Sequence, residues 1–205
     1  MPSRSPVPVI KTPAPDGILV PAGMIQKRVQ ELALEIGDDV RGAEVRVIGV
    51  LKGAVVFLSD LIRRLPVPVT LDFIAVSSYG VSTESSGVVR IVKDLDEAID
   101  GANVLLVEDI VDTGLTLKYL MDYLKGRNPR LLRTCALLDK PERRLADVRL
   151  DYCGFKIPDL FVVGYGLDAG GKDRQHPFVA VMGGSALGER TLEQTQDSGG
   201  PMENV

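Results

Sequence analysis

The chain has 205 residues, of which 45% are hydrophobic, so it is long enough to bury one sizeable core. The formal net charge of −4 argues against nucleic acid as the main partner, because binding to a phosphate backbone usually requires a basic excess. Apolar runs reach only about seven residues, well short of the roughly 20 that cross a bilayer, and residues 1–9 do not have the character of a signal peptide. We therefore expect a cytoplasmic protein with no membrane partner.

The cysteine and histidine content limits the chemistry that the chain can perform. Cys135 and Cys153 have no CxxC spacing and no histidine cluster beside them, so we expect neither a disulfide framework nor a zinc site. Cys135 lies in an apolar run and is expected in the core. The single histidine, His176, cannot form a metal cage alone. Acid–base chemistry must therefore depend on carboxylates or lysines.

Both ends of the chain are expected to be disordered. Residues 1–17 contain five prolines, and residues 188–205 consist mainly of small and polar residues with little to bury. The prediction is one folded domain over residues 18–187 between two disordered segments.

Apolar strands and amphipathic helices alternate along the domain. In chain order the pattern predicts a helix at 24–36, a strand at 45–51, a helix at 54–65, strands at 71–76, 88–92 and 104–107, a helix at 115–124, and strands at 131–138, 160–165 and 178–182. Uniformly apolar strands that alternate with helices indicate an α/β fold, with a mostly parallel twisted sheet and helices on both faces. The polar stretch 77–87 predicts a long mobile loop.

Three carboxylates follow the strand predicted at 104–107. Glu108, Asp109 and Asp112 occupy three of five consecutive positions, and a Thr-Gly turn then leads into the next helix. Ligands of such sheets bind at the carboxyl ends of the strands, so this loop is a candidate site. A simple helix cap by Asp112 or Thr113 is the alternative, but a cap needs one acceptor rather than three carboxylates.

The same loop has two chemically different halves. Backbone N–H groups of residues 112–116 and the hydroxyls of Thr113 and Thr116 can hold a phosphate, and Gly114 allows close approach. Glu108 and Asp109 would repel a phosphate, so they favour sugar hydroxyls or a hard cation such as Mg²⁺. A sugar phosphate bound with Mg²⁺ satisfies both halves. The chain contains no G-x-x-x-x-G-K-[ST] sequence, which excludes an ordinary P-loop.

Five stretches resemble one enzyme family. VLLVEDIVDTG, at 104–114, resembles the phosphoribosyl-diphosphate signature of type I phosphoribosyltransferases. GVLKG, at 49–53, resembles the pyrophosphate loop of the hypoxanthine-guanine phosphoribosyltransferases, where a non-proline cis peptide is frequent. SSYGVSTESSG resembles their mobile lid, and LLDKPERR with FVVGYGLD resembles their purine pocket. The resemblance implies their fold, with a small hood formed by the chain ends, Mg²⁺ as cofactor, and a homo-oligomer, either dimer or tetramer.

The resemblance also implies a purine salvage reaction. Phosphoribosyl diphosphate would donate 5-phosphoribose to an oxopurine base, hypoxanthine or guanine, giving IMP or GMP and pyrophosphate. Asp112 matches the family's general base at purine N7, and the neighbouring carboxylates are expected to favour proton uptake there. A helix-capping role for Asp112 could coexist. The implied contacts to the 5-phosphate and ribose fall on Glu108, Asp109, Ile110, Val111, Asp112, Thr113, Gly114, Leu115 and Thr116.

The remaining roles that the resemblance implies are distributed along the chain. Lys140 would donate to the 6-oxo group of the purine and disfavour adenine, which presents a donor there. Each residue also has a plainer interpretation: Lys52 and Lys140 as solvated lysines, and Phe161 as core. Arg174 lies in a segment that departs from the family's aromatic-Arg-Asn-Leu-Pro pattern. The implied contacts are Lys52, Gly53 and Arg174 for pyrophosphate, Lys140, Phe161, Val162 and Asp168 for the purine, Glu108, Asp109 and Asp168 for the metal, and Ser78 and Tyr79 in the lid.

Two other functions share parts of this pattern. One is a xanthine-preferring phosphoribosyltransferase, and the other is a regulator that senses phosphoribosyl diphosphate and binds nucleic acid. The presence of Asp112, Lys140 and the lid, together with the negative net charge, favours the enzyme. The segment at 164–169 matches G-x-G-x-x-A, but the residues after it cannot begin a regular helix, which excludes a dinucleotide site.

Overall fold

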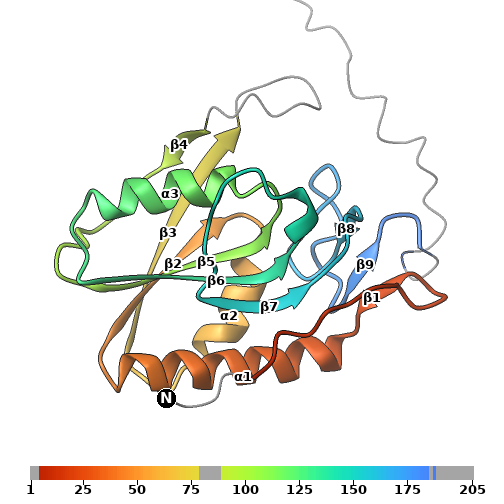
Figure 1. Ribbon diagram of the computed structural model, residues 1–205, viewed down its shortest axis with the longest axis horizontal. Coiled ribbons are helices and arrows are strands. Elements are labelled where there is room, and N and C mark those ends of the chain that lie inside the picture. The colour runs from red at the N-terminus through yellow and green to blue at the C-terminus, as the bar shows by residue number, and fades with distance from the viewer. Residues whose placement is uncertain (1–4, 79–88, 185–186, 188–205) are drawn as a thin grey trace, which may run out of the picture.

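The computed structural model describes residues 5–78, 89–184 and 187. Its main sheet consists of β2 (Val45–Leu51), β3 (Val69–Ser78), β4 (Val89–Lys93), β5 (Asn103–Val111), β6 (Leu131–Asp139) and β7 (Tyr152–Lys156). The strand order is β4-β3-β2-β5-β6-β7 (Figure 1). Strands β3, β2, β5, β6 and β7 are parallel, and β4 pairs antiparallel with β3. The predicted mostly parallel sheet is therefore confirmed.

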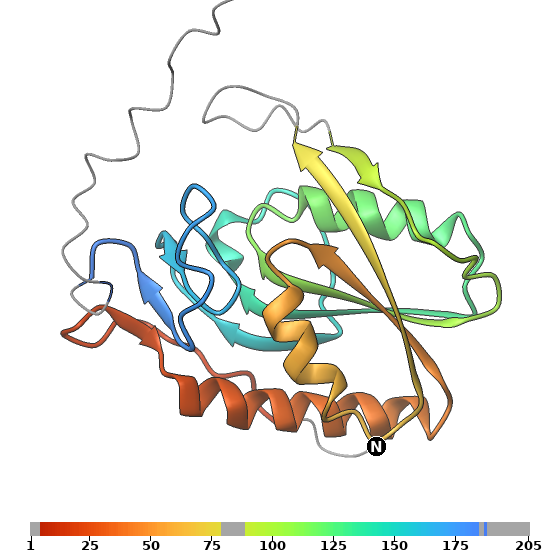
Figure 2. The ribbon, with the colours of Figure 1, turned by 180° about the vertical axis from the view of Figure 1, so that it is seen from behind.

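Helices cover both faces of this sheet. Helices α1 (Ala22–Val40) and α2 (Val55–Ile62) pack on one face, and α3 (Leu115–Lys125) packs on the other (Figures 1 and 2). A short 3-10 helix, η1 (Pro141–Arg143), follows β6. None of the helices in the described ranges is both long and apolar enough to span a membrane.

The protein has two hydrophobic cores, one on each face of the main sheet, and consecutive side chains of β5 contribute to them in turn. Leu105 and Val107 pack in the cluster that contains α1 and α2, whereas Val104 and Leu106 pack in the cluster that contains α3. Neighbouring residues of a strand point to opposite faces, so a strand buried on both sides has a continuous apolar sequence. This explains why the run at 104–107 shows no polar alternation.

The hood is a second, smaller sheet built from distant parts of the chain. It consists of β1 (Ile18–Val20), β9 (Val179–Val181) and β8 (Val162–Val163), in the order β1-β9-β8 and antiparallel throughout. Tyr165, just after β8, donates a hydrogen bond of 2.5 Å from its hydroxyl to Asp60 of α2. This contact holds the hood loop against the main domain.

Several strands differ from the prediction. The strand predicted at 104–107 continues to Val111, because Glu108 and Ile110 remain paired with β6. Strands β1 and β7 were not predicted. The strand predicted at 160–165 shortens to Val162–Val163 and belongs to the hood, since Gly164 and Tyr165 have positive φ values and begin a turn.

The start of the chain is more ordered than predicted. The amide of Lys156 donates to the carbonyl of Pro8 at 2.9 Å, and the amide of Ile10 donates to the carbonyl of Lys156 at 2.8 Å. The prediction of disorder throughout residues 1–17 is wrong for this stretch, because its backbone finds partners at the edge of β7. The predicted tail, 188–205, lies outside the described residues, and the domain boundaries stay a prediction.

Both cysteines are free and buried. Cys135 is 1% exposed, which confirms its predicted place in the core. Burial raises the pKa of the Cys153 thiol to about 12. Both thiols are therefore kept protonated and unreactive at neutral pH.

Candidate active site

Glu108 and Asp109 lie near the carboxyl end of β5, and each is next to a different loop. Glu108 lines a cavity of about 100 Å³ at the start of α3. Asp109 lies against the loop after β2, where a Cβ atom built on Gly53 would come within 1.6 Å of its Oδ2. The two side chains begin on opposite faces of the strand because they are consecutive. Only a glycine at position 53 therefore lets the second loop approach the acidic pair.

Burial raises the pKa of both carboxyls. The pKa of Glu108 lies well above its usual 4.5, mainly through burial and then through the charge of Asp109. The pKa of Asp109 is raised by burial as well, and the nearby charge of Arg174 opposes this shift. A buried and a partly buried acid side by side favour a hydroxyl-bearing or cationic ligand that would share or neutralise their charge.

Asp112 lies in a different environment from the other two acids. Its Oδ1 is 3.0 Å from Nε of Arg143, and its Oδ2 is 4.0 Å from Nζ of Lys140. Asp112 therefore has two basic neighbours that the sequence spacing did not predict, and it also lines the same cavity as Glu108. The side chain is 41% exposed, so a ligand can reach it.

The helix-capping interpretation holds for Thr113, whose Oγ1 accepts a hydrogen bond of 3.4 Å from the amide of Leu115, the first residue of α3. The N-cap itself is Gly114, with a φ of 82°, which has no side chain to cap the helix. The first N–H groups of a helix lack partners within the helix and carry its positive dipole end. This end of α3 is therefore suited to an anion.

The cavity at this end of α3 gathers most of the predicted phosphate and ribose residues. Its lining consists of Glu108, Ile110, Val111, Asp112, Thr113, Gly114, Thr116 and Leu117. Leu115 and Asp109 were predicted for the same contacts but do not line it. Leu117 was not predicted, and its helical position one turn below the loop gave no sequence signal.

The predicted pyrophosphate residues lie in one corner. The Leu51–Lys52 peptide is cis, as the family resemblance implied. A Cβ atom on Gly166 would come within 2.1 Å of the Gly53 carbonyl, so the hood loop packs directly on this turn. Arg174 donates from Nη1 to the Gly166 carbonyl at 2.6 Å. Arg174 thus reaches the corner despite its atypical neighbours.

The predicted purine residues come from the end of β6 and from the hood. Lys140 is 6% exposed and lies 3.6 Å from Asp159, so the interpretation as a solvated lysine is wrong. Phe161 is 61% exposed, so it is not a core residue, and an exposed aromatic face is suited to stacking. Val162 is buried in β8. Ser78 ends β3, while Tyr79 and the rest of the predicted lid lie outside the described residues.

Both carboxylate oxygens of Asp168 already have partners, which was not expected of a metal ligand. Its Oδ1 is 2.5 Å from Nη2 of Arg174, and its Oδ2 accepts a hydrogen bond of 2.6 Å from the Gly171 amide. No three His, Cys, Asp or Glu side chains in the described part of the chain are grouped to hold a metal ion. Mg²⁺ commonly uses one or two carboxylates together with substrate phosphates and water, so the pair at the end of β5 fits it without a third protein ligand.

Sequence reasoning missed the residues that support these groups. Arg143 and Asp159 contact Asp112 and Lys140, and Arg144 pairs with Asp139. Three of the four lie within the stretch LLDKPERR, which was singled out only for its lysine.

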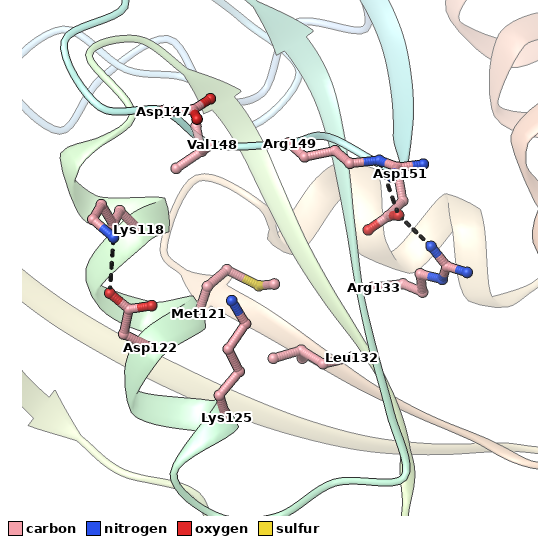
Figure 3. Close-up of a pocket in the computed structure, with 10 residues that line it drawn as sticks. All are labelled: Lys118, Met121, Asp122, Lys125, Leu132, Arg133, Asp147, Val148, Arg149 and Asp151. Atoms are coloured by element: carbon pink, nitrogen blue, oxygen red, sulfur yellow. Dashed lines mark hydrogen bonds and ion pairs between the residues drawn. The ribbon is translucent and has the colours of Figure 1, made fainter.

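A larger cavity, of about 290 Å³, lies between α3 and residues 147–151 (Figure 3). Several of its charged groups are already paired, since Lys118 contacts Asp122 at 3.1 Å and Arg133 contacts Asp151 at 2.6 Å. Neither acid of the β5 pair lines it. We therefore assign the candidate site to the smaller cavity.

The chain is similar to proteins of one known enzyme family. The model of the phosphoribosyl transferase domain family matches residues 20–169. A hypoxanthine-guanine phosphoribosyltransferase from Mycobacterium avium is 52% identical over 171 residues, which cover 80% of this chain and 84% of that protein.

Two solved structures extend the comparison. The hypoxanthine-guanine phosphoribosyltransferase of Bacillus anthracis, crystallised with HEPES in its active site, is 51% identical with a TM-score of 0.77, covering 80% of this chain and 96% of that one. The hypoxanthine phosphoribosyltransferase of Trypanosoma cruzi, in complex with the product IMP, is 43% identical with a TM-score of 0.75, covering 80% and 92%.

Proposed function

The chain belongs to the hypoxanthine-guanine phosphoribosyltransferase family, and on this premise we propose that it transfers 5-phosphoribose from phosphoribosyl diphosphate to hypoxanthine or guanine. The products are IMP or GMP and pyrophosphate. The observation that carries the proposal is the acidic pair at the end of β5, which contacts the anion cavity of α3 on one side and Gly53 on the other.

The loop before α3 and the loop after β2 bind different parts of phosphoribosyl diphosphate. The cavity at the start of α3 holds the 5-phosphate through the amides of residues 112–116 and the hydroxyls of Thr113 and Thr116. The loop containing Lys52 and Gly53 holds the pyrophosphate mainly through backbone amides, and Arg174 adds a positive charge at the same corner. The ribose then lies over the acidic pair.

Glu108 and Asp109 accept hydrogen bonds from the ribose hydroxyls and hold Mg²⁺ by one or two oxygens. When bound, Mg²⁺ neutralises charge on the departing diphosphate. Asp168 has both oxygens engaged, so the metal site depends mainly on the β5 pair. Positive charge that develops on the sugar during transfer is stabilised by the same carboxylates.

Asp112 acts as the general base for the purine. Its carboxylate takes or shares the proton on N7 while N9 attacks the sugar. Lys140 donates to the 6-oxo group, with Phe161 stacked on the base and the Val162 backbone at its edge. Adenine is disfavoured because its 6-amino group is a donor and would face the ammonium of Lys140, which is also a donor.

The proposal also covers the setting of the reaction. The enzyme works in the cytoplasm as a homo-oligomer.

The proposal is tested by measuring nucleotide formation with five different bases. The purified full chain is incubated with phosphoribosyl diphosphate, Mg²⁺ and, separately, hypoxanthine, guanine, xanthine, adenine or uracil, and nucleotide formation is followed by chromatography. We expect IMP and GMP, and no product from adenine or uracil. A preference for xanthine would assign the chain to xanthine salvage, and no nucleotide from any base would refute the transferase and favour the sensor.

A further inference from the structure

The phosphate loop, residues 111–114, precedes α3, and the carbonyl groups of its first three residues accept hydrogen bonds from one neighbouring segment. The carbonyl of Val111 accepts from the Lys140 amide at 2.9 Å, and that of Asp112 accepts from Nη1 of Arg144 at 3.1 Å. The carbonyl of Thr113 accepts from the amides of Leu145 and Ala146, at 2.9 and 3.1 Å. The segment 140–146 therefore lies behind the loop as a continuous support.

This arrangement fixes the direction of the loop amides. In a planar trans peptide the carbonyl of one residue and the N–H of the next point in opposite directions. Because the carbonyls of residues 111–113 point toward 140–146, the N–H groups of residues 112–114 point away from that segment. Residues 140–146 do not line the anion cavity, whereas residues 110–114 do. The support thus turns a series of donors toward the cavity.

Arg144 is the side chain at the centre of this support. It is 20% exposed, and its Nη2 pairs with Asp139, the last residue of β6. Its guanidinium also packs on the loop, since a Cβ atom on Gly114 would come within 3.0 Å of its Nη1. One planar guanidinium therefore joins a buried carboxylate at the sheet to a carbonyl of the loop, which a lysine ammonium cannot do in the same way.

We infer that Arg144 is a positioning residue, which holds the phosphate loop in the conformation that directs its amides at the 5-phosphate. The inference rests on the proposed function, because the phosphate is that of the substrate and product. Arg144 itself contacts no reacting atom. Its removal should weaken recognition of the phosphate specifically, rather than recognition of the purine.

The test compares IMP with inosine, which lacks only the phosphate. Affinities of both are measured by calorimetric competition for the wild type, Arg144→Met and Arg144→Lys, with Arg149→Ala as control because Arg149 lies just beyond the supporting segment and is 79% exposed. We expect the preference for IMP over inosine to fall about tenfold in Arg144→Met, as for loss of a hydrogen bond from a charged donor. Inosine affinity should change less than about twofold.

The Arg144→Lys variant distinguishes a loss of loop positioning from a general loss of folding. Arg144→Lys keeps a positive charge near Asp139 and should remain folded by thermal unfolding, yet it should lose most of the same preference. An unchanged preference for IMP in a folded Arg144 variant would overturn the inference, as would equal weakening of IMP and inosine. If the wild type fails to bind IMP, the proposed function fails instead. Arg149→Ala should match the wild type.

Discussion

At the scale of single residues, the site separates its carboxylates by environment. Glu108 is buried, Asp109 is partly buried, and both have raised pKa values, which suits groups that bind sugar hydroxyls or hold a cation. Asp112 is half-exposed beside Arg143 and Lys140, which suits a group that meets a base entering from solvent. Their spacing in sequence suggested one group of carboxylates; in the structure Asp112 shares a cavity with Glu108 but also has basic neighbours.

The role of Asp112 is tested by Asp112→Asn, which keeps the shape of the side chain and removes its basicity. We expect kcat with hypoxanthine to fall by about 100-fold or more, the usual contribution of a general base. The affinity for phosphoribosyl diphosphate should stay within about threefold, since the loop amides remain. Steady-state kinetics and calorimetry measure the two effects, and wild-type turnover in the variant would remove Asp112 as the base.

The role of Lys140 is tested by Lys140→Ala. Loss of a buried charged donor to the 6-oxo group should raise the KM for hypoxanthine about tenfold or more. Lys118→Ala is a matched control, because Lys118 is a surface lysine that pairs only with Asp122 in the described part of α3. An unchanged KM for hypoxanthine in Lys140→Ala would contradict the assigned contact.

At the scale of elements, the sequence predicted the strand, turn and helix units well, because periodicity and apolar runs are local signals. Strand β2 has the predicted bounds, and α3 differs by one residue. The end of β5 could not be predicted, since Glu108 is held in the sheet by its pairing with β6 rather than by strand propensity. Strand β7 contains Gly154, where a Cβ atom would lie 2.3 Å from the Leu137 carbonyl, and such tertiary contact leaves no periodic pattern.

The burial of Glu108 in the extended part of β5 lowers the stability of the ligand-free protein at neutral pH. Burial raises the folded-state pKa of Glu108, so between its unfolded and folded pKa values the folded protein binds more protons than the unfolded chain. The ligand-free wild type therefore loses stability as the pH rises through that interval. Glu108→Gln lacks this titration, and its stability relative to wild type should increase from about pH 4.5 upward, by at most about 1.4 kcal/mol per pH unit.

Urea unfolding of both proteins between about pH 4.5 and 8 measures this difference. Glu142→Gln, at the exposed η1, is the control and should show a constant difference from wild type. A difference between Glu108→Gln and wild type that does not change with pH would show that burial at the end of β5 does not disfavour the charged form.

At the scale of the whole molecule, the site depends on contacts between distant parts of the chain. Gly53 meets Asp109 and also Gly166, so the loop after β2, the end of β5 and the hood converge on one point. The hood is fixed to α2 by the Tyr165 hydroxyl on Asp60. The sequence resemblance gave the chemistry of each loop, but it could not show that Arg144 and Asp139 support the phosphate loop, because those contacts arise only when β6 lies beside β5.

The central claim is that the end of β5 and the start of α3 form the phosphoribosyl site. A crystal structure of the protein with phosphoribosyl diphosphate and Mg²⁺ tests it most directly. We predict difference density with the 5-phosphate at the amides of residues 112–116 and the ribose hydroxyls at Glu108 and Asp109. Density for the ligand in the cavity between α3 and residues 147–151, with the acidic pair left in contact with water alone, would contradict the account.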